Sequence, residues 1–533
     1  MKQFLLIATL LTFLKVFTAQ YVTWDDPVLV INNPLLKLPF LEAIPIFFTS
    51  FYHGDYMPLT LISYWVEVAL FGYNPLPSHI LNFVLHLGCG IALFKFLRST
   101  RLKEGSILLV CAIFLLHPLQ VEPVMWISER KGLLSSFLLL VAMVASQKAE
   151  TKSTKIRGMY LLAYYSLFFG ALLTKATGVF IPAFLLWSDV RPRADAGALS
   201  FWKAIRKHAV PGLLAALIIM IRISAYKGEV SNLSSFLFEP QRLLQLPLIV
   251  SSILGFYLSS FCFPISQSII YPEFRLDGTL VMRFLTTCAF FIALMGLWKK
   301  TRNTEVSFFA LFSFVLLLPV LQIVPRLNFV SDRYMYLPII GIAGLGAIAL
   351  EQISLRNLKV GFFLTILCLA PLSNFRSGVW ADDFHLWSNA VETAPWSGLA
   401  RNNYAMVLEK QGDVRAAVAE FEKSLTLGKR DGTDNLAYNN LGVLYSRDPK
   451  ILDQNRAISY FEAGIAEAQR REESYTLRYN LAGSYASIGQ IVKAKNILSE
   501  LEKDLVTATR DKKYLDLLAL TQDMIKKIQA QKM

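Results

Sequence analysis

Long apolar runs, separated by short polar segments, fill the first 376 residues of the chain. The hydrocarbon core of a bilayer is about 30 Å thick and needs roughly 20 apolar residues per helix. Most runs approach that length, and together they predict an all-α, polytopic bundle of transmembrane helices. We expect spans near residues 4–19, 78–97, 105–118, 133–147, 159–174, 178–189, 209–224, 246–263, 279–298, 305–324, 337–352 and 360–375.

The remaining residues form charged, alanine-rich sequence that favours helices. Three segments share the small-and-large pattern of a tetratricopeptide (TPR) helical hairpin; they begin at Tyr404, Leu441 and Leu481. We predict a transmembrane domain over 1–376 and a TPR α-solenoid over 377–533, with a capping helix at 513–530. Such an array offers a concave surface for an extended peptide or protein. A spacer or an oligomerisation module explains the repeats equally well.

Composition and charge fit a membrane protein. Charged residues make up 17% of the chain, against roughly 25% in soluble domains. The net charge is +14, because residues 1–380 hold 32 Lys and Arg against 18 Asp and Glu, while residues 381–533 hold 21 of each. The surplus lies in the apolar part, as expected for cytoplasmic loops of a membrane protein. Nucleic-acid binding is therefore disfavoured.

Basic clusters orient the spans. We expect the clusters to face the cytoplasm; they lie at 98–103, 148–157, 191–207, 299–302 and 356–359. Three apolar runs separate the third cluster from the fourth, whereas a return to the same side requires an even number. One of these runs, or the stretch 225–250, is therefore expected to be re-entrant or interfacial. About 11 spans remain, which places the tail outside the cytoplasm.

The N-terminal run fits either an uncleaved anchor or a signal peptide that ends near Ala19. We expect the anchor, because Lys15 interrupts the apolar core and many further spans follow. In both cases residues 21–77 lie outside the cytoplasm.

Several function classes lack support. The five cysteines all lie in apolar runs without metal-ligand spacing, which excludes a disulfide scaffold or a zinc module. No Walker loop, GxGxxG, GxSxG or HExxH motif is present, so nothing indicates ATP- or NAD-driven chemistry or serine or zinc hydrolysis.

Two adjacent carboxylates, Asp25 and Asp26, follow the first apolar run. Crowding and partial burial raise the pKa of at least one such group, which suits a general base. The alternative is an interfacial turn in which an aspartate caps a helix.

A second polar patch holds His117, Glu122 and Arg130 between apolar segments, where charged groups are costly. His117 and Glu122 suit a metal or a proton, and Arg130 suits a phosphate. A helix-terminal cluster paired internally is the alternative. Because a metal site needs three or more ligands, metal binding stays open.

Further cations lie in apolar surroundings. Lys175, between two short apolar runs, suits an anionic lipid phosphate, unless it snorkels to the interface. Arg333 suits a phosphate or pyrophosphate, and Tyr334 and Tyr336 suit an aromatic belt or a sugar platform.

With these patches in order, the chain resembles the TPR-tailed glycosyltransferases of the GT-C superfamily, above all the transmembrane-and-TPR-containing O-mannosyltransferases and their bacterial relatives. The resemblance covers the whole chain. The matching stretches are Trp24-Asp25-Asp26 with Asn33-Pro34, His117-Pro118 with Glu122 and Trp126-Ile127-Ser128, Lys175, Asp332-Arg333-Tyr334-Met335-Tyr336-Leu337-Pro338, and Trp380 with Leu386-Trp387.

The resemblance implies an integral-membrane glycosyltransferase that uses a polyprenyl-phosphate-linked sugar and transfers it outside the cytoplasm to a protein or peptide hydroxyl. The catalytic base would be one of Asp25 and Asp26, and Glu122 would be the second-loop acid. Arg130, Lys175 and Arg333 are candidates for holding the phosphate, from charge as much as from the resemblance. The TPR tail would help to bind the acceptor.

The chain departs from the family pattern at three points. Many relatives have Gly-Arg-x-Asp where this chain has Glu129-Arg130-Lys131-Gly132, and Lys-Glu where it has Lys175-Ala176. The acid before Arg-Tyr is often Glu in relatives, and here it is Asp332. A divalent metal therefore stays open as a cofactor.

Two other functions fit the sequence: a non-enzymatic, membrane-anchored TPR scaffold for envelope proteins, and a transporter of lipid-linked sugars. Short loops without sorting signals favour a bacterial inner membrane, with the endoplasmic reticulum as the alternative.

Overall fold

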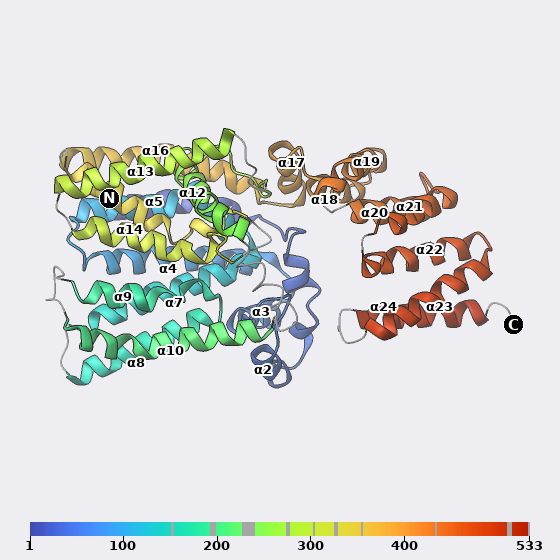
Figure 1. Ribbon diagram of the computed structural model, residues 1–533, viewed down its shortest axis with the longest axis horizontal. Helices are drawn as coiled ribbons and strands as arrows, with labels where there is room; N and C mark the ends of the chain where they lie inside the picture. Colours follow the sequence, from blue (N-terminus) through green and yellow to red (C-terminus); the bar gives the residue numbers. More distant parts are fainter. Residues whose placement is uncertain are drawn as a thin grey trace. The chain divides into compact units, whose positions relative to one another are not determined.

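The computed structural model describes residues 1–150, 154–191, 199–225, 240–272, 278–301, 304–324, 329–352, 355–431, 434–468, 470–508 and 514–530. Apart from one isolated bridge between Tyr52 and Asp55, every regular element in these ranges is a helix (Figure 1). The chain forms two compact units, Met1–Leu386 and Trp387–Met533. The division falls within α17 (Asp383–Thr393), ten residues after the boundary expected from composition.

The first unit is a bundle of apolar helices. Its longer helices are α4 (Pro75–Leu97), α7 (Arg130–Lys148), α8 (Thr154–Leu172), α10 (Phe201–Ala225), α12 (Pro240–Cys262), α13 (Gly278–Thr301) and α16 (Leu355–Val379). The shorter ones are α1 (Lys2–Thr12), α2 (Phe40–Thr49), α3 (Pro58–Phe71), α5 (Glu104–Leu116), α6 (Val121–Met125), α9 (Ile181–Asp189), α14 (Thr304–Leu317) and α15 (Ile339–Glu351).

Five helices in the described part of the chain, namely α4, α10, α12, α13 and α16, are long and apolar enough to cross a bilayer. The structure thus supports an integral-membrane protein, as the sequence predicts. Six further apolar helices have 10–17 residues, and the figure of about 11 spans stays a prediction. Parts of the basic clusters at 148–157, 191–207 and 299–302, and part of the stretch 225–250, lie outside the described residues.

The structure differs from the predicted spans at three points. The first apolar helix ends at Thr12 and continues as a 3-10 turn, Leu14–Phe17. Helices α2 and α3 lie within residues 21–77, where the sequence predicts no span. The sharply bent apolar pair is Glu104–Leu116 with Pro118–Met125, at 55°, whereas the three runs expected to include a re-entrant segment form the long helices α10, α12 and α13. Proline explains the bend, because Pro118 has no N–H to donate and disfavours a helical conformation at His117.

The acidic segment after α1 is held against α2 and α3 by a small apolar core. Leu29, Val30 and Leu36 pack there with Phe47 and Tyr64. The Tyr64 hydroxyl also donates to the carbonyl of Ile127 at 2.8 Å. The core therefore joins the segment that carries Asp25 to the connection between α6 and α7.

The second unit is a row of antiparallel helical hairpins (Figure 1). Its helices are α18 (Gly398–Lys410), α19 (Val414–Asp431), α20 (Asp434–Arg447), α21 (Gln454–Glu467), α22 (Tyr475–Ser487), α23 (Ile491–Ala508) and α24 (Leu515–Ala530). Small and large residues interlock in the core, as the repeat pattern predicts: a Cβ on Gly442 would lie 2.4 Å from the Phe461 ring. The assignment of these hairpins to the TPR class stays a prediction.

Candidate active site

One pocket in the first unit gathers several of the candidate residues. It encloses about 490 Å³ of space, some of it open to solvent. Its walls come from α6, the start of α7, the 3-10 turn Ala176–Gly178, the end of α14 and the segment 333–338. Four predicted site residues line it: Lys175, Arg333, Tyr334 and Tyr336.

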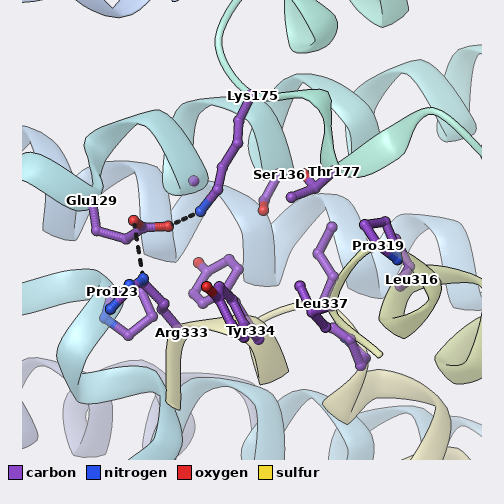
Figure 2. A pocket seen from close by; sticks show the side chains of 14 residues that line it. Pro123, Glu129, Ser136, Lys175, Thr177, Leu316, Pro319, Arg333, Tyr334 and Leu337 are labelled. Atoms are coloured by element: carbon purple, nitrogen blue, oxygen red, sulfur yellow. Dashed lines mark hydrogen bonds and ion pairs between the residues drawn. The ribbon is translucent and has the colours of Figure 1, made fainter. Parts of the chain in front are cut away.

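Two cations approach one carboxylate in this pocket. Lys175 forms an ion pair with Glu129, and Arg333 Nε lies 3.9 Å from the second oxygen of Glu129. Figure 2 shows the two cations reaching Glu129 from different sides. Gly132 leaves the space for this arrangement, because a Cβ there would lie 2.2 Å from Glu129 Oε1. This partner could not be predicted from local sequence, because Glu129 lies 46 residues before Lys175.

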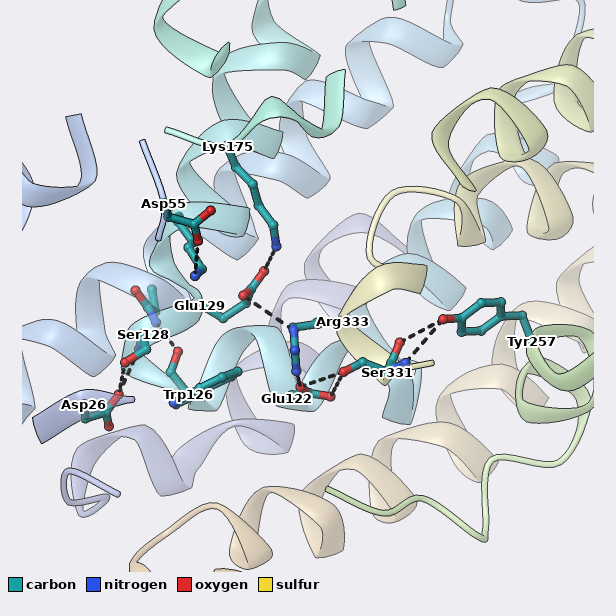
Figure 3. A network of polar contacts seen from close by, with 12 residues as sticks. Asp26, Asp55, Glu122, Trp126, Ser128, Glu129, Lys175, Tyr257, Ser331 and Arg333 are labelled. Carbon is teal, nitrogen blue, oxygen red and sulfur yellow. Dashed lines mark hydrogen bonds and ion pairs between the residues drawn. The ribbon is translucent and has the colours of Figure 1, made fainter. Parts of the chain in front are cut away.

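A second carboxylate, Glu122, holds the Arg333 guanidinium through a different nitrogen from the one that approaches Glu129. Glu122, which is 4% exposed, accepts from Arg333 Nη1 at 2.6 Å and from the Ser331 hydroxyl at 3.2 Å. The contacts continue to Tyr257, whose hydroxyl lies 3.3 Å from the Ser331 N–H, and Figure 3 shows the whole network. Two cations thus alternate with two carboxylates, and an incoming anion would compete with Glu129 for both cations.

The two adjacent aspartates occupy different environments. Asp26 is fully buried and accepts from the Val22 N–H and the Ser128 N–H, both at 3.0 Å, and from the Ser128 hydroxyl. Burial outweighs these bonds and raises the pKa of Asp26 to about 6. Asp26 therefore ties its segment to the turn that carries Glu129.

Asp25 is only partly buried, and within the described residues its carboxylate makes no hydrogen bond. Burial raises the pKa of Asp25, although Lys131 and Arg333 act in the opposite direction. Because it interacts electrostatically with Arg333 and Glu129, Asp25 lies near the pocket. A carboxylate with a raised pKa and free oxygens can accept a proton.

Arg130 and His117, both predicted site residues, do not line the pocket. Arg130 is fully buried; it pairs with Glu67 at 2.7 Å and donates to Asn82 Oδ1 at 3.0 Å. His117 caps the turn after α5 by accepting from the Leu119 N–H, while its Nε2 lies 2.9 Å from the Phe261 carbonyl. Both side chains already have partners within the fold.

The tyrosines form one wall of the pocket. Tyr336 is buried, and its hydroxyl lies 2.8 Å from His86 Nδ1. The Arg333 guanidinium lies 5.3 Å from the centre of the Tyr334 ring and 5.2 Å from that of Trp126. These rings fix the guanidinium by cation–π contacts.

Glu129 has no role predicted from the sequence, although it joins Lys175 to Arg333 in the structure. Among the residues that the structure describes, no three His, Cys, Asp or Glu side chains gather as metal ligands would.

Curated relatives agree with the chemistry of the predicted resemblance. The chain is 25% identical over 488 residues to human Protein O-mannosyl-transferase TMTC1, covering 79% of this chain and 54% of the relative. The predicted resemblance to the O-mannosyltransferases is confirmed. The chain is also 22% identical to Protein O-mannosyl-transferase F38B6.6 of Caenorhabditis elegans, over 76% of this chain and 59% of the relative. For mouse Protein O-mannosyl-transferase TMTC3 the identity is 24%, over 69% of this chain and 44% of the relative.

The chain spans about half the length of these curated relatives. No family model matches it. Among solved structures, ArnT from Cupriavidus metallidurans bound to undecaprenyl phosphate is 14% identical and covers 90% of this chain and 84% of its own. The TM-score of that pair is 0.39, too low to show a shared fold.

Proposed function

We propose that the chain is a membrane glycosyltransferase that moves a sugar from a polyprenyl-phosphate donor to a hydroxyl of a protein or peptide. One observation carries this proposal: Lys175 and Arg333 converge on a single pocket near Asp25, a partly buried carboxylate that accepts no hydrogen bond from the described part of the chain. The O-mannosyltransferase relatives support the acceptor class. The short loops support a bacterial inner membrane, and the surplus of basic residues in the loops that would face the cytoplasm supports a pocket and a tail on the other side.

Asp25 acts as the base. The acceptor oxygen attacks C1 of the sugar and passes its proton to Asp25, while the bond between C1 and the phosphate oxygen breaks and its electron pair stays on the phosphate. The sugar carries positive charge in the transition state, which a nearby carboxylate also stabilises. The raised pKa of Asp25 makes it a better proton acceptor than an ordinary aspartate at neutral pH.

Lys175 and Arg333 hold the donor phosphate. The leaving phosphate gains negative charge as the sugar departs, so these cations bind the transition state more tightly than the donor, which is the condition for catalysis. Glu129 neutralises them before the donor binds, and Glu122 keeps Arg333 oriented.

The remaining candidates have supporting roles. Asp26 holds its segment against Ser128, and Arg130 anchors the start of α7 through Glu67, as their buried contacts indicate. Tyr334 and Tyr336 shape the wall beside the phosphate, and His117 caps the turn before α6. We assign no step to a metal.

The test is sugar transfer by the full-length chain in lipid nanodiscs. Polyprenyl-phosphate donors carrying radiolabelled mannose or another hexose are mixed with Ser- and Thr-containing peptides and with envelope proteins. The proposal predicts that label becomes attached to the peptide or protein. β-Elimination should then release this label, as it does for a sugar linked to Ser or Thr. Peptide capture with no transfer from any donor would favour the scaffold, and movement of the donor across the bilayer without transfer would favour the transporter.

A further inference from the structure

Five asparagine side chains form one continuous hydrogen-bonded series along the hairpins of the second unit. Asn480 donates to Asn439 at 2.8 Å, Asn439 to Asn440 at 3.4 Å, Asn440 to Asn402 at 2.9 Å, and Asn402 to Asn403 at 3.3 Å. We call these five residues the amide series. It crosses the first helix of each of three successive hairpins, α18, α20 and α22.

The series lies on the inner side of the row of hairpins. Helices α18, α20 and α22 contact one another in turn, more closely than α19, α21 and α23 do. Asn403, Asn439, Asn440 and Asn480 are partly exposed, while Asn402 is buried. The four partly exposed amides therefore line the concave face, and the buried Asn402 links Asn440 to Asn403.

The amide series has hydrogen-bond donors and acceptors that its internal contacts do not use. A carboxamide offers two N–H donors and two acceptor lone pairs, and the contacts above use only one of each at Asn439 and Asn440. Within the described residues, Asn403 Nδ2 and Asn480 Oδ1 make no hydrogen bond at all. The four partly exposed amides thus present a mixture of donors and acceptors to solvent.

From this geometry we infer that the amide series binds the backbone of an extended polypeptide, with little regard for its side chains. An extended backbone presents one N–H and one C=O per residue, which is the pattern that a row of carboxamides complements. If the proposed function holds, this polypeptide is the acceptor; the inference rests on that function only for the identity of the ligand.

The spacing sets the length of the bound segment. Packed helices lie about 8–10 Å apart, and an extended chain rises about 3.3 Å per residue. Each interval between neighbouring helices therefore corresponds to about three peptide residues, and the two intervals from α18 to α22 correspond to about six.

The experiment measures the affinity of the full-length chain in nanodiscs, without donor, for a fluorescent Ser/Thr/Val/Ala peptide of about 12 residues. Three further probes are a scrambled peptide, a peptide of about 3 residues, and a backbone N-methylated version of the first peptide. We expect the scrambled peptide to bind equally. The short and N-methylated peptides should bind at least about tenfold more weakly, because each lost hydrogen bond costs a several-fold change in affinity.

Two variants locate the site. Asn440→Ala interrupts the amide series, and Asn403→Ala removes only its terminal amide, which accepts a single bond and so leaves the packing intact. Both variants should bind the peptide several-fold to about tenfold more weakly than the wild type. The unfolding temperature of Asn403→Ala should stay unchanged. Asn496→Ala, at an exposed position on α23, is the matched control and should bind as the wild type does.

Unchanged binding by both series variants would overturn the inference, as would loss of binding on scrambling. Since no donor is present, peptide binding without sugar transfer would count against the proposed function alone, and transfer with unchanged binding in the variants would count against the amide series alone.

Discussion

Arg333 pairs with Glu122 at 2.6 Å, although 211 residues separate them in the chain. This contact fixes the segment before α15 against α6 and directs Arg333 towards Glu129, which Lys175 reaches from the α8–α9 connection. The pocket is therefore assembled from three distant segments. Its two cations share Glu129, which an anionic donor would have to displace, while Glu122 continues to hold Arg333.

Replacing Lys175 tests the phosphate subsite. Lys175→Met should lower kcat/KM for the donor by about 10–100-fold, because a charge-assisted hydrogen bond contributes about 1.5–3 kcal/mol. It also leaves Glu129 buried without its partner, which lowers stability. The double variant Lys175→Met/Glu129→Gln should regain the unfolding temperature but not the activity. Recovery of donor kinetics in the double variant would mean that Lys175 acts only as a structural partner.

Arg130 should affect stability and not donor binding. Arg130→Met leaves Glu67 uncompensated in a buried site, which costs about 3–5 kcal/mol. We expect a lower thermal midpoint in detergent and a wild-type KM for the protein that remains folded. Arg130→Met/Glu67→Met should regain much of the midpoint. A stable Arg130→Met variant with a raised donor KM would instead place Arg130 on the phosphate.

The substitution Gly132→Ala tests whether the position of Glu129 in its ion pair with Lys175 matters for donor binding. In Gly132→Ala the new Cβ would lie 2.2 Å from Glu129 Oε1 and 3.3 Å from Lys175 Nζ, so the Glu129 side chain must move away from Lys175. We expect a change in donor KM of several-fold with a small change in stability. Gly346→Ala on α15, where nothing lies within 4 Å, is the control. Equal donor kinetics in the two variants would show that the Glu129 position does not matter.

The pKa of Asp26 predicts a pH dependence of stability. It rises from 3.8 to about 6 on folding, so the folded state binds more protons than the unfolded state between these values, and stability falls as pH rises through this window. As the pH rises from about 4 to about 6, the thermal midpoint of the wild type should therefore fall relative to that of Asp26→Asn. A difference that stays constant or grows over this range would contradict the assignment.

The apolar pattern predicted the longer helices well. The predicted span 78–97 corresponds to Pro75–Leu97 and 279–298 to Gly278–Thr301, because burial in lipid requires continuous apolar sequence. Helices α2 and α3 were missed: they have 10 and 14 residues, too few for a span, and Pro45 interrupts α2.

The site was predictable only as a set of separate patches. The sequence marked Asp25, Lys175 and Arg333 by charge in apolar surroundings, but their arrangement depends on tertiary contacts that spacing does not encode. Asp25 and Asp26 show the limit most clearly. The two residues are adjacent in sequence, but their environments differ because the Ser128 N–H and hydroxyl donate hydrogen bonds to Asp26 and not to Asp25.

The most direct measurement compares sugar transfer by wild type, Asp25→Asn and Glu42→Gln, an exposed acid on α2, in nanodiscs with a labelled polyprenyl-phosphate sugar. A general base contributes about 10²–10⁴-fold, so Asp25→Asn should lose transfer by that factor with an unchanged unfolding temperature, while Glu42→Gln transfers normally. Transfer by Asp25→Asn at the wild-type rate would contradict the account.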